Sequence, residues 1–153
     1  METPHWLRNH PYTIIRSLRI LNMALLGASG AAVLLMNEYG YTYDIYKNED
    51  DLITIGLVVT FTLCGLALLL FVFHWTRITI KASEDLWFFM LIACGLIAFI
   101  FFIFDIAYAT VCDENDECVE IKAMVAAAVF KLLSMVVWFC DAIHVKYVSY
   151  KHY

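Results

Sequence analysis

Three charged residues that lie within long apolar stretches are the main candidates for chemistry in this chain: Asp105, Lys131 and Asp141. A charged side chain in a hydrocarbon layer is costly, so it usually serves an ion or proton path or pairs with another charge. The single acid–base pair of Asp105 and Lys131 does not make a transport path. We therefore expect these residues to neutralise partners on other helices, with a proton or ion relay as the alternative.

Asp105 and Lys131 come from consecutive apolar stretches joined by a short connection, which predicts antiparallel helices. Measured from that connection, Lys131 lies about four residues deeper than Asp105, or about 6 Å at 1.5 Å per residue. Helical side chains lean toward the N-terminus of their own helix, so these two lean toward each other. The spacing predicts a buried Asp105–Lys131 pair that holds the two helices together.

Asp141 lies near the end of the last stretch, at the depth of Arg16 and Arg19 before the first stretch. A cluster of Arg16, Arg19 and Asp141 would join the last helix to the first. His74 and His144 end two stretches at the same level, and a haem held by both is the alternative use of this end of the molecule. Two histidines at helix ends arise easily by chance, so we expect no cofactor.

The motifs of the common enzyme classes are missing from the sequence. It has no glycine-rich phosphate loop, no nucleophile elbow and no metalloprotease histidine spacing. It also lacks a Cys-x-x-Cys motif, which argues against a membrane thiol oxidoreductase. We predict that the protein is not an enzyme and holds no catalytic metal.

The elements that must position these residues are four long apolar stretches, residues 20–36, 52–75, 86–109 and 123–145. Each is close to the ~20 apolar residues with which a helix crosses a ~30 Å hydrocarbon layer. The 153-residue chain is 63% hydrophobic and only 16% charged, whereas a soluble domain carries about 25% charged residues. We therefore predict an all-α fold, a four-transmembrane-helix bundle that uses residues 1–153 as a single domain.

The charges outside the stretches fall on two sides. The segments before the first stretch, between the second and third, and after the fourth contain seven basic residues: Arg8, Arg16, Arg19, Arg77, Lys81, Lys146 and Lys151. The other two connections are acidic, with Lys47 and Lys122 as their only basic residues. Since basic connections stay in the cytoplasm, both termini are predicted to be cytoplasmic and the acidic connections extracellular or lumenal. We expect the plasma membrane or endomembrane vesicles as the location.

The positions of the cysteines agree with this orientation. Cys112 and Cys118 are the only cysteines in a connection, and that connection is assigned to the side where disulfides persist. We predict a Cys112–Cys118 disulfide, with two free thiols or a metal site among the neighbouring acids as alternatives. Cys140, near the predicted cytoplasmic end of the last stretch, is a candidate for S-acylation.

The first stretch contains a run of small residues. Gly27 and Ala31, or Ala28 and Ala32, are four apart and would let another helix approach closely. A smooth patch that faces lipid is the alternative. Residues 12–19, which precede this stretch, combine apolar and basic side chains and are expected to form an amphipathic lead-in at the membrane surface.

The order of these features resembles the MARVEL-type tetraspan family, which includes the MAL, physin and occludin groups. The resemblance rests on the basic lead of residues 15–20, the acidic pair Glu84–Asp85 before the third stretch, and the aromatic and small residues around Trp138 in the fourth. It covers nearly the whole chain. Lys131, in the middle of a helix, departs from the family's pattern.

The resemblance implies a non-enzymatic protein that organises membranes, cell junctions or vesicle trafficking through helix and outer-loop contacts. No catalytic residues come with it. The sequence leaves two alternatives: an auxiliary subunit of a larger channel or receptor complex, and a small transporter or proton conductor that uses Asp105, Lys131 and Asp141. The expected partners are the lipid bilayer and other membrane proteins or further copies of the chain, and no nucleic acid.

Overall fold

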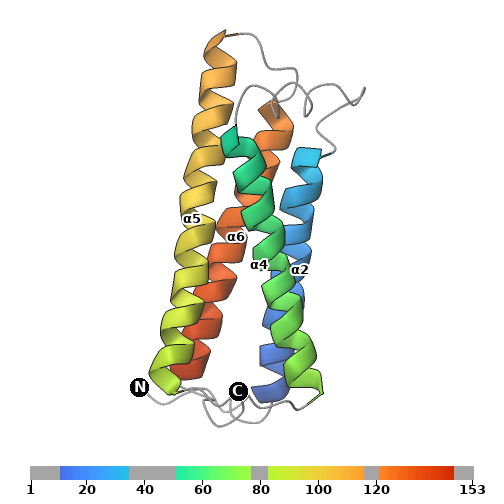
Figure 1. Ribbon diagram of the computed structural model, residues 1–153, viewed down its shortest axis with the longest axis vertical. Coiled ribbons are helices and arrows are strands. Elements are labelled where there is room, and N and C mark those ends of the chain that lie inside the picture. Colours follow the sequence, from blue (N-terminus) through green and yellow to red (C-terminus); the bar gives the residue numbers. More distant parts are fainter. Residues whose placement is uncertain (1–10, 35–50, 77–82, 116–120, 147–153) are drawn as a thin grey trace.

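The computed structural model describes residues 11–34, 51–76, 83–115 and 121–146. These residues form four helices: α2 (Pro11–Leu34), α4 (Asp51–Trp75), α5 (Glu84–Asn115) and α6 (Ile121–His144) (Figure 1). All four are long and apolar enough to cross a membrane. The all-α fold and the four candidate spans agree with the prediction from sequence.

Helix α2 begins earlier than the sequence predicted. It begins at Pro11 rather than at residue 20, and proline is tolerated there because the first turn of a helix has no backbone hydrogen bond to lose. Ile15 and Arg19 are buried in the bundle. The expectation of a separate lead-in on the membrane surface is therefore wrong, because these residues continue the buried face of α2.

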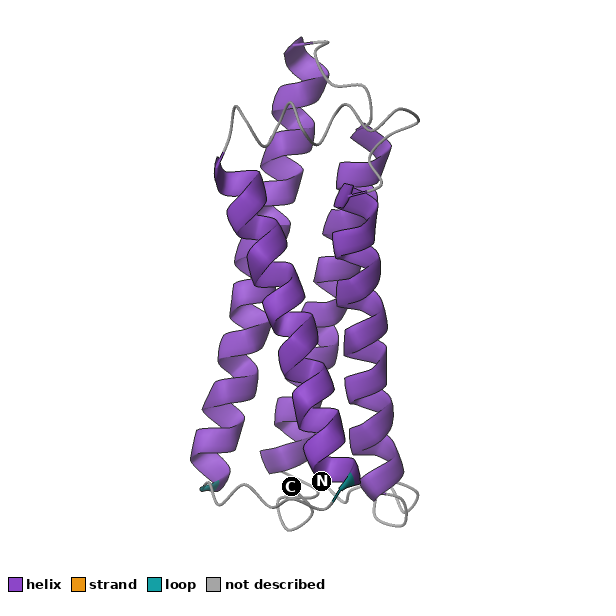
Figure 2. Ribbon diagram, turned by 45° about the vertical axis from the view of Figure 1, so that its right-hand side comes forward, coloured by secondary structure: helices purple, strands orange, loops and turns teal. Residues whose placement is uncertain are grey.

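Helix α5 runs past the predicted end of its span. It continues to Asn115 rather than ending at residue 109, and it extends beyond the other helices at one end of the bundle (Figures 1 and 2). Cys112 therefore lies on the helix, while Cys118 falls within residues 116–120, outside the described part of the chain. The Cys112–Cys118 disulfide stays a prediction.

The helices alternate in direction, so that α2 begins and α6 ends at the same end of the bundle (Figure 1). Helix α2 packs on α4 and α6, and α6 also packs on α5. In contrast, α4 and α5 barely touch each other. The bundle is therefore held together mainly by α2 and α6, and these two helices carry most of the buried polar side chains.

The buried face of α2 repeats with alternating steps of four and three residues: Ile15, Arg19, Asn22, Leu26, Ser29 and Val33. The buried residues of α6 include a matching series: Lys131, Ser134, Trp138 and Asp141. This spacing has a mean repeat of about 3.5 residues, with which two helices keep one seam in contact. The polar side chains therefore lie on buried faces and point into the bundle.

The outward faces are apolar, as expected for helices surrounded by lipid. Large exposed apolar side chains occur on every helix: Leu21 on α2, Val58 and Leu68 on α4, Phe89 on α5 and Val136 on α6 are examples. Polar side chains inside and apolar side chains outside form the arrangement that suits a hydrocarbon solvent.

Two glycines allow close contacts between neighbouring helices. A Cβ atom on Gly30 of α2 would clash with the Phe61 ring of α4, and one on Gly95 of α5 would clash with the Phe139 ring of α6. The lack of a side chain thus lets an aromatic ring of the next helix pack against the backbone. Gly27 differs, since a Cβ atom there would meet no atom within 4 Å.

Candidate functional site

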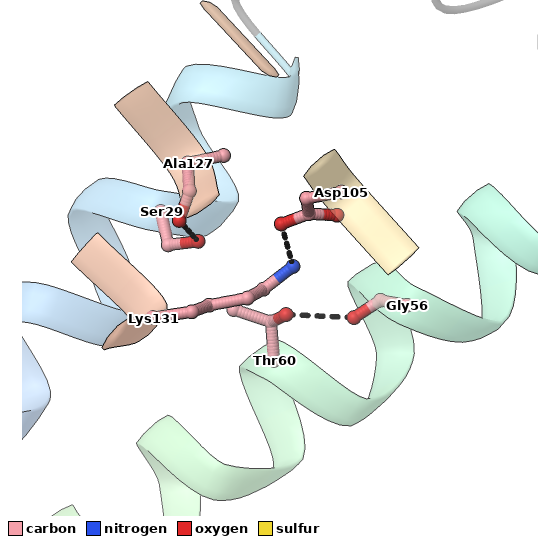
Figure 3. Close-up of polar contacts among 6 residues, drawn as sticks. All are labelled: Ser29, Gly56, Thr60, Asp105, Ala127 and Lys131. Carbon is pink, nitrogen blue, oxygen red and sulfur yellow. Dashed lines mark hydrogen bonds and ion pairs between the residues drawn. The ribbon is translucent and has the colours of Figure 1, made fainter. Parts of the chain in front are cut away.

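Lys131 and Asp105 form a short ion pair that is buried within the described bundle. Lys131 Nζ, from α6, lies 2.6 Å from Asp105 Oδ2, from α5. Their side chains are 3% and 10% exposed, respectively, and Figure 3 shows the ammonium directed at the carboxylate. The structure thus brings together the two residues that the sequence predicted as a pair.

Two buried hydroxyl groups accompany this pair (Figure 3). Ser29 donates to the carbonyl oxygen of Ala127 at 2.9 Å, and Thr60 donates to that of Gly56 at 2.7 Å. Each hydroxyl proton is engaged with a backbone carbonyl and would have to leave it before it could enter a proton relay. The buried polar residues of this region form what we call the lysine cluster: Ser29, Thr60, Asp105 and Lys131.

Arg19 contacts all three of the other helices from α2. Its Nη1 donates to the carbonyl oxygen of Leu70 on α4 at 2.9 Å. Its Nε lies 3.7 Å from Asp141 Oδ2 on α6, and its guanidinium carbon lies 5.8 Å from the centre of the Trp87 ring on α5. Arg19 and Asp141 are almost fully buried, so a single charged side chain joins the four helices at this end.

Arg16 lies one turn before Arg19 and contacts α4. Its Nε donates to Nδ1 of His74 at 3.3 Å, and its guanidinium carbon lies 4.6 Å from the centre of the Trp75 ring. The predicted cluster was Arg16, Arg19 and Asp141. In the structure Arg19 pairs with Asp141, whereas Arg16 contacts His74 and Trp75, which the prediction did not assign to it. We call Arg16, Arg19, His74 and Asp141 the arginine cluster.

The two histidines predicted at one level, His74 and His144, are both buried near the ends of α4 and α6. The Nδ1 atom of His74 accepts the hydrogen bond from Arg16, so this ring serves the packing of α2 on α4. Within the described residues, no group of three or more His, Cys, Asp or Glu side chains is placed to hold a metal ion.

Between the two clusters, α2 and α6 share a neutral hydrogen bond. Ser134 Oγ donates to Asn22 Oδ1 at 2.8 Å, and both residues are fully buried. Asn22 Nδ2 and Trp138 Nε1, on the same buried faces, have no hydrogen-bond partner among the described residues. The sequence prediction did not include Asn22 or Ser134. Asn22 lies three residues after Arg19, and Ser134 lies seven residues before Asp141, so helical spacing places each on the same face as a predicted residue.

The other predicted residues lie apart from these clusters. Cys140 is exposed on the outer face of α6. The predicted packing residues of α2 are each half-buried: Gly27, Ala28, Ala31 and Ala32. The tight approach of α2 to α4 is at Gly30, which lies in the same run of small residues but was not predicted.

The buried acids and bases thus meet in pairs at two depths of the bundle. On α2 the fully buried Leu26 lies between Asn22 and Ser29 and separates the polar levels along that helix. Such an arrangement can hold helices in register, and ionisable groups inside a membrane can also move protons. No protein-family model, curated protein or solved structure matches the chain.

Proposed function

We propose that this chain is a non-enzymatic integral membrane protein that organises membranes and partner proteins through its helix faces and outer connections. The observation that carries the proposal is the internal pairing of buried charges, Lys131 with Asp105 and Arg19 with Asp141. Charges that pair within the bundle engage each other rather than a substrate. The surfaces left for contacts are the apolar outer faces and the connections between helices.

The energetics of helix association in lipid support this proposal. Helices in a bilayer lack the hydrophobic driving force of water and associate through packing and polar contacts. A buried acid–base pair is a directional contact, and the loss of one partner leaves a costly unpaired charge. Such pairs therefore specify which helices meet, which is the task of a rigid scaffold.

The charge asymmetry of the sequence supports an orientation with both termini in the cytoplasm and the acidic connections outside. In that orientation the arginine cluster is on the cytoplasmic side. The resemblance to MARVEL-type tetraspan proteins supports a role in membrane apposition, cell junctions or vesicle trafficking. An auxiliary subunit of a channel or receptor complex is a version of the same proposal, in which the outer faces bind one large partner.

A small proton conductor is the second candidate, because one bundle carries ionisable pairs at two depths. In that case Asp105, Lys131 and Asp141 would exchange protons with water from the two sides of the membrane. The hydroxyl groups of Ser29 and Thr60 argue against it, since their protons are held by backbone carbonyls.

The test replaces the whole Asp105–Lys131 pair by apolar residues, in the double variant Asp105→Leu with Lys131→Met. Replacing both partners of a buried ion pair is often neutral for stability, so a scaffold should keep its assembly. Wild type and double variant are purified in a mild detergent, and their oligomeric state and stoichiometric partners are compared by mass spectrometry. We expect the same assembly for both proteins.

The same two proteins are then reconstituted into vesicles that enclose a pH-sensitive dye, and the decay of an imposed pH gradient is followed. A scaffold gives no proton flux above that of protein-free vesicles. Flux in the wild type that the double variant loses while it keeps its assembly would contradict the proposal and identify a proton conductor.

The material that co-purifies decides between the two versions of the proposal. A single large membrane protein in stoichiometric amount would identify an auxiliary subunit. Copies of the chain with lipid alone would identify a membrane organiser that acts through self-association.

A further inference from the structure

A shallow groove on α4, close to the arginine cluster, opens on the outer face of the bundle. It has a volume of about 230 Å³ and is lined by Phe71, Val72 and Trp75. The rings of Phe71 and Trp75 are tilted, with centroids 5.9 Å apart, and Trp75 is 59% exposed. The lining side chains are apolar, so in a membrane the groove faces acyl chains.

A positive charge lies at one edge of this groove. The guanidinium of Arg16 lies over the Trp75 ring, 4.6 Å from its centre, and its Nε donates to His74 at 3.3 Å. Contacts between α2 and α4 therefore fix the position of this charge. Trp75 ends α4, and exposed tryptophan prefers the boundary between hydrocarbon and headgroups. The charge is thus placed at the level of lipid headgroups.

We propose that the groove and Arg16 bind one anionic phospholipid, with its phosphate on the guanidinium and an acyl chain along Phe71, Val72 and Trp75. Arginine suits phosphate because its planar fork of donors makes paired, charge-assisted hydrogen bonds. A basic group and an apolar groove that meet at one tryptophan match a ligand with a charged head and an apolar tail. The inference does not rest on the proposed function, since a scaffold and a proton conductor can both bind such a lipid.

Charge complementarity favours an anionic over a zwitterionic lipid. A choline headgroup brings its own positive charge next to Arg16, whereas a serine or glycerol headgroup leaves the lipid with a net negative charge. One basic residue near the membrane surface strengthens the binding of anionic lipid roughly fivefold. In the orientation predicted from the sequence, this end of the bundle faces the cytoplasmic leaflet, where anionic lipids are concentrated.

Trp75 provides the reporter for the test, because bromine atoms on an acyl chain quench tryptophan fluorescence on contact. The full-length protein is placed in phosphatidylcholine vesicles with a small fraction of brominated phosphatidylserine or brominated phosphatidylcholine. The difference between wild type and Trp75→Phe isolates the signal of Trp75. We expect brominated phosphatidylserine to quench this signal at roughly one fifth of the lipid fraction that brominated phosphatidylcholine requires.

Two variants and one control separate the parts of the site. Arg16→Gln removes the charge and is expected to make the two lipids quench equally. Val72→Phe fills the groove but keeps Arg16, and it is expected to reduce quenching to the level of bulk lipid. Lys146→Gln is the control and should keep the preference, because Lys146 is a basic residue near the same end that contacts Asp85 and Phe88 of α5, whereas the groove is on α4.

Equal quenching of the wild type by both lipids would overturn the proposal. An equal loss of the preference for phosphatidylserine in Arg16→Gln and Lys146→Gln would also overturn it. That result would indicate diffuse attraction of anionic lipid to every basic residue at this end. Loss of the preference on adding inorganic phosphate at constant ionic strength would identify a simple anion site instead. If Arg16→Gln does not fold, Val72→Phe tests the proposal alone. An unchanged preference for phosphatidylserine in Val72→Phe would show that the lipid does not bind in the groove.

Discussion

The two charged clusters of this bundle differ in how many helices they join. In the lysine cluster, the ion pair joins α5 to α6 through one contact of 2.6 Å. In the arginine cluster, Arg19 alone reaches α4, α5 and α6, through a carbonyl oxygen, an aromatic ring and a carboxylate. The first contact is short and local, and the second is spread over several partners.

This difference follows from the chemistry and the depth of the two cations. Lysine presents a compact ammonium, which suits one close carboxylate, whereas the planar guanidinium of arginine can meet several partners at once. Lys131 lies near the middle of its helix, while Asp141, the partner of Arg19, lies near the end of α6. Water reaches a helix end more easily than the centre of a bilayer. We therefore expect the loss of Lys131 to cost more than the loss of Arg19.

The largest expected effect is that of Lys131→Met, which leaves Asp105 as an unpaired buried charge. Removing one partner of a buried ion pair lowers the free energy of unfolding by about 3–5 kcal/mol. Unfolding in mixed micelles with increasing SDS, followed by circular dichroism, measures the change. Asp105→Asn in the Lys131→Met background is the control and should recover most of the loss. A further loss in that double variant would show that the two charges do not balance each other.

Arg19→Met comes next, with an expected loss of about 2–3 kcal/mol in the free energy of unfolding, because hydrogen bonds to charged groups are lost. Arg16→Met is the matched variant. It removes a contact over the Trp75 ring and a long hydrogen bond to His74, and should cost about 1 kcal/mol. The same unfolding measurement applies to both. An equal cost for the two arginines would mean that the contacts of Arg19 with three helices do not act together.

Gly95→Ala compares apolar packing with the ion pair at the same α5–α6 interface. A methyl group there would clash with the Phe139 ring, and such overpacking costs about 1–3 kcal/mol. Gly65→Ala is the control, since a Cβ atom there meets nothing within 4 Å, and the variant should gain up to about 1 kcal/mol from helix propensity. If Gly95→Ala cost more than Lys131→Met, packing rather than charge would dominate this interface.

The sequence was sufficient for the features that depend on length, charge and depth alone. Four apolar stretches of spanning length lead directly to four long helices. The depth of Asp105 and Lys131 could be counted from the connection that joins their helices, so their contact followed. Residue depth likewise placed Asp141 at the level of Arg16 and Arg19, but it did not show that Arg19 is the one that contacts Asp141.

The features that depend on how each helix is rotated could not be predicted in this way. Hydropathy assigned the residues before position 20 to the membrane surface, whereas Ile15 and Arg19 are buried by helices that are distant in sequence. The contact glycine of α2 is Gly30 rather than Gly27, because the ring of Phe61 on α4 faces it. The rotation of a helix can be inferred from the sequence only through the four-and-three spacing of its buried positions. Residues 27–32 are all small, so this spacing alone does not show which of them face another helix.

The smallest expected effect is that of Ser134→Ala, which lies between the two clusters. It removes the neutral hydrogen bond to Asn22, and such bonds between membrane helices contribute about 0.6 kcal/mol on average. Asn22→Leu is the matched variant and should be close to neutral, because it also removes Asn22 Nδ2, a buried donor without a hydrogen-bond partner among the described residues. Both are measured by SDS unfolding. A loss from Ser134→Ala as large as that from Lys131→Met would show that the polar residues of the seam act as one network, and the two clusters would then no longer be separate units.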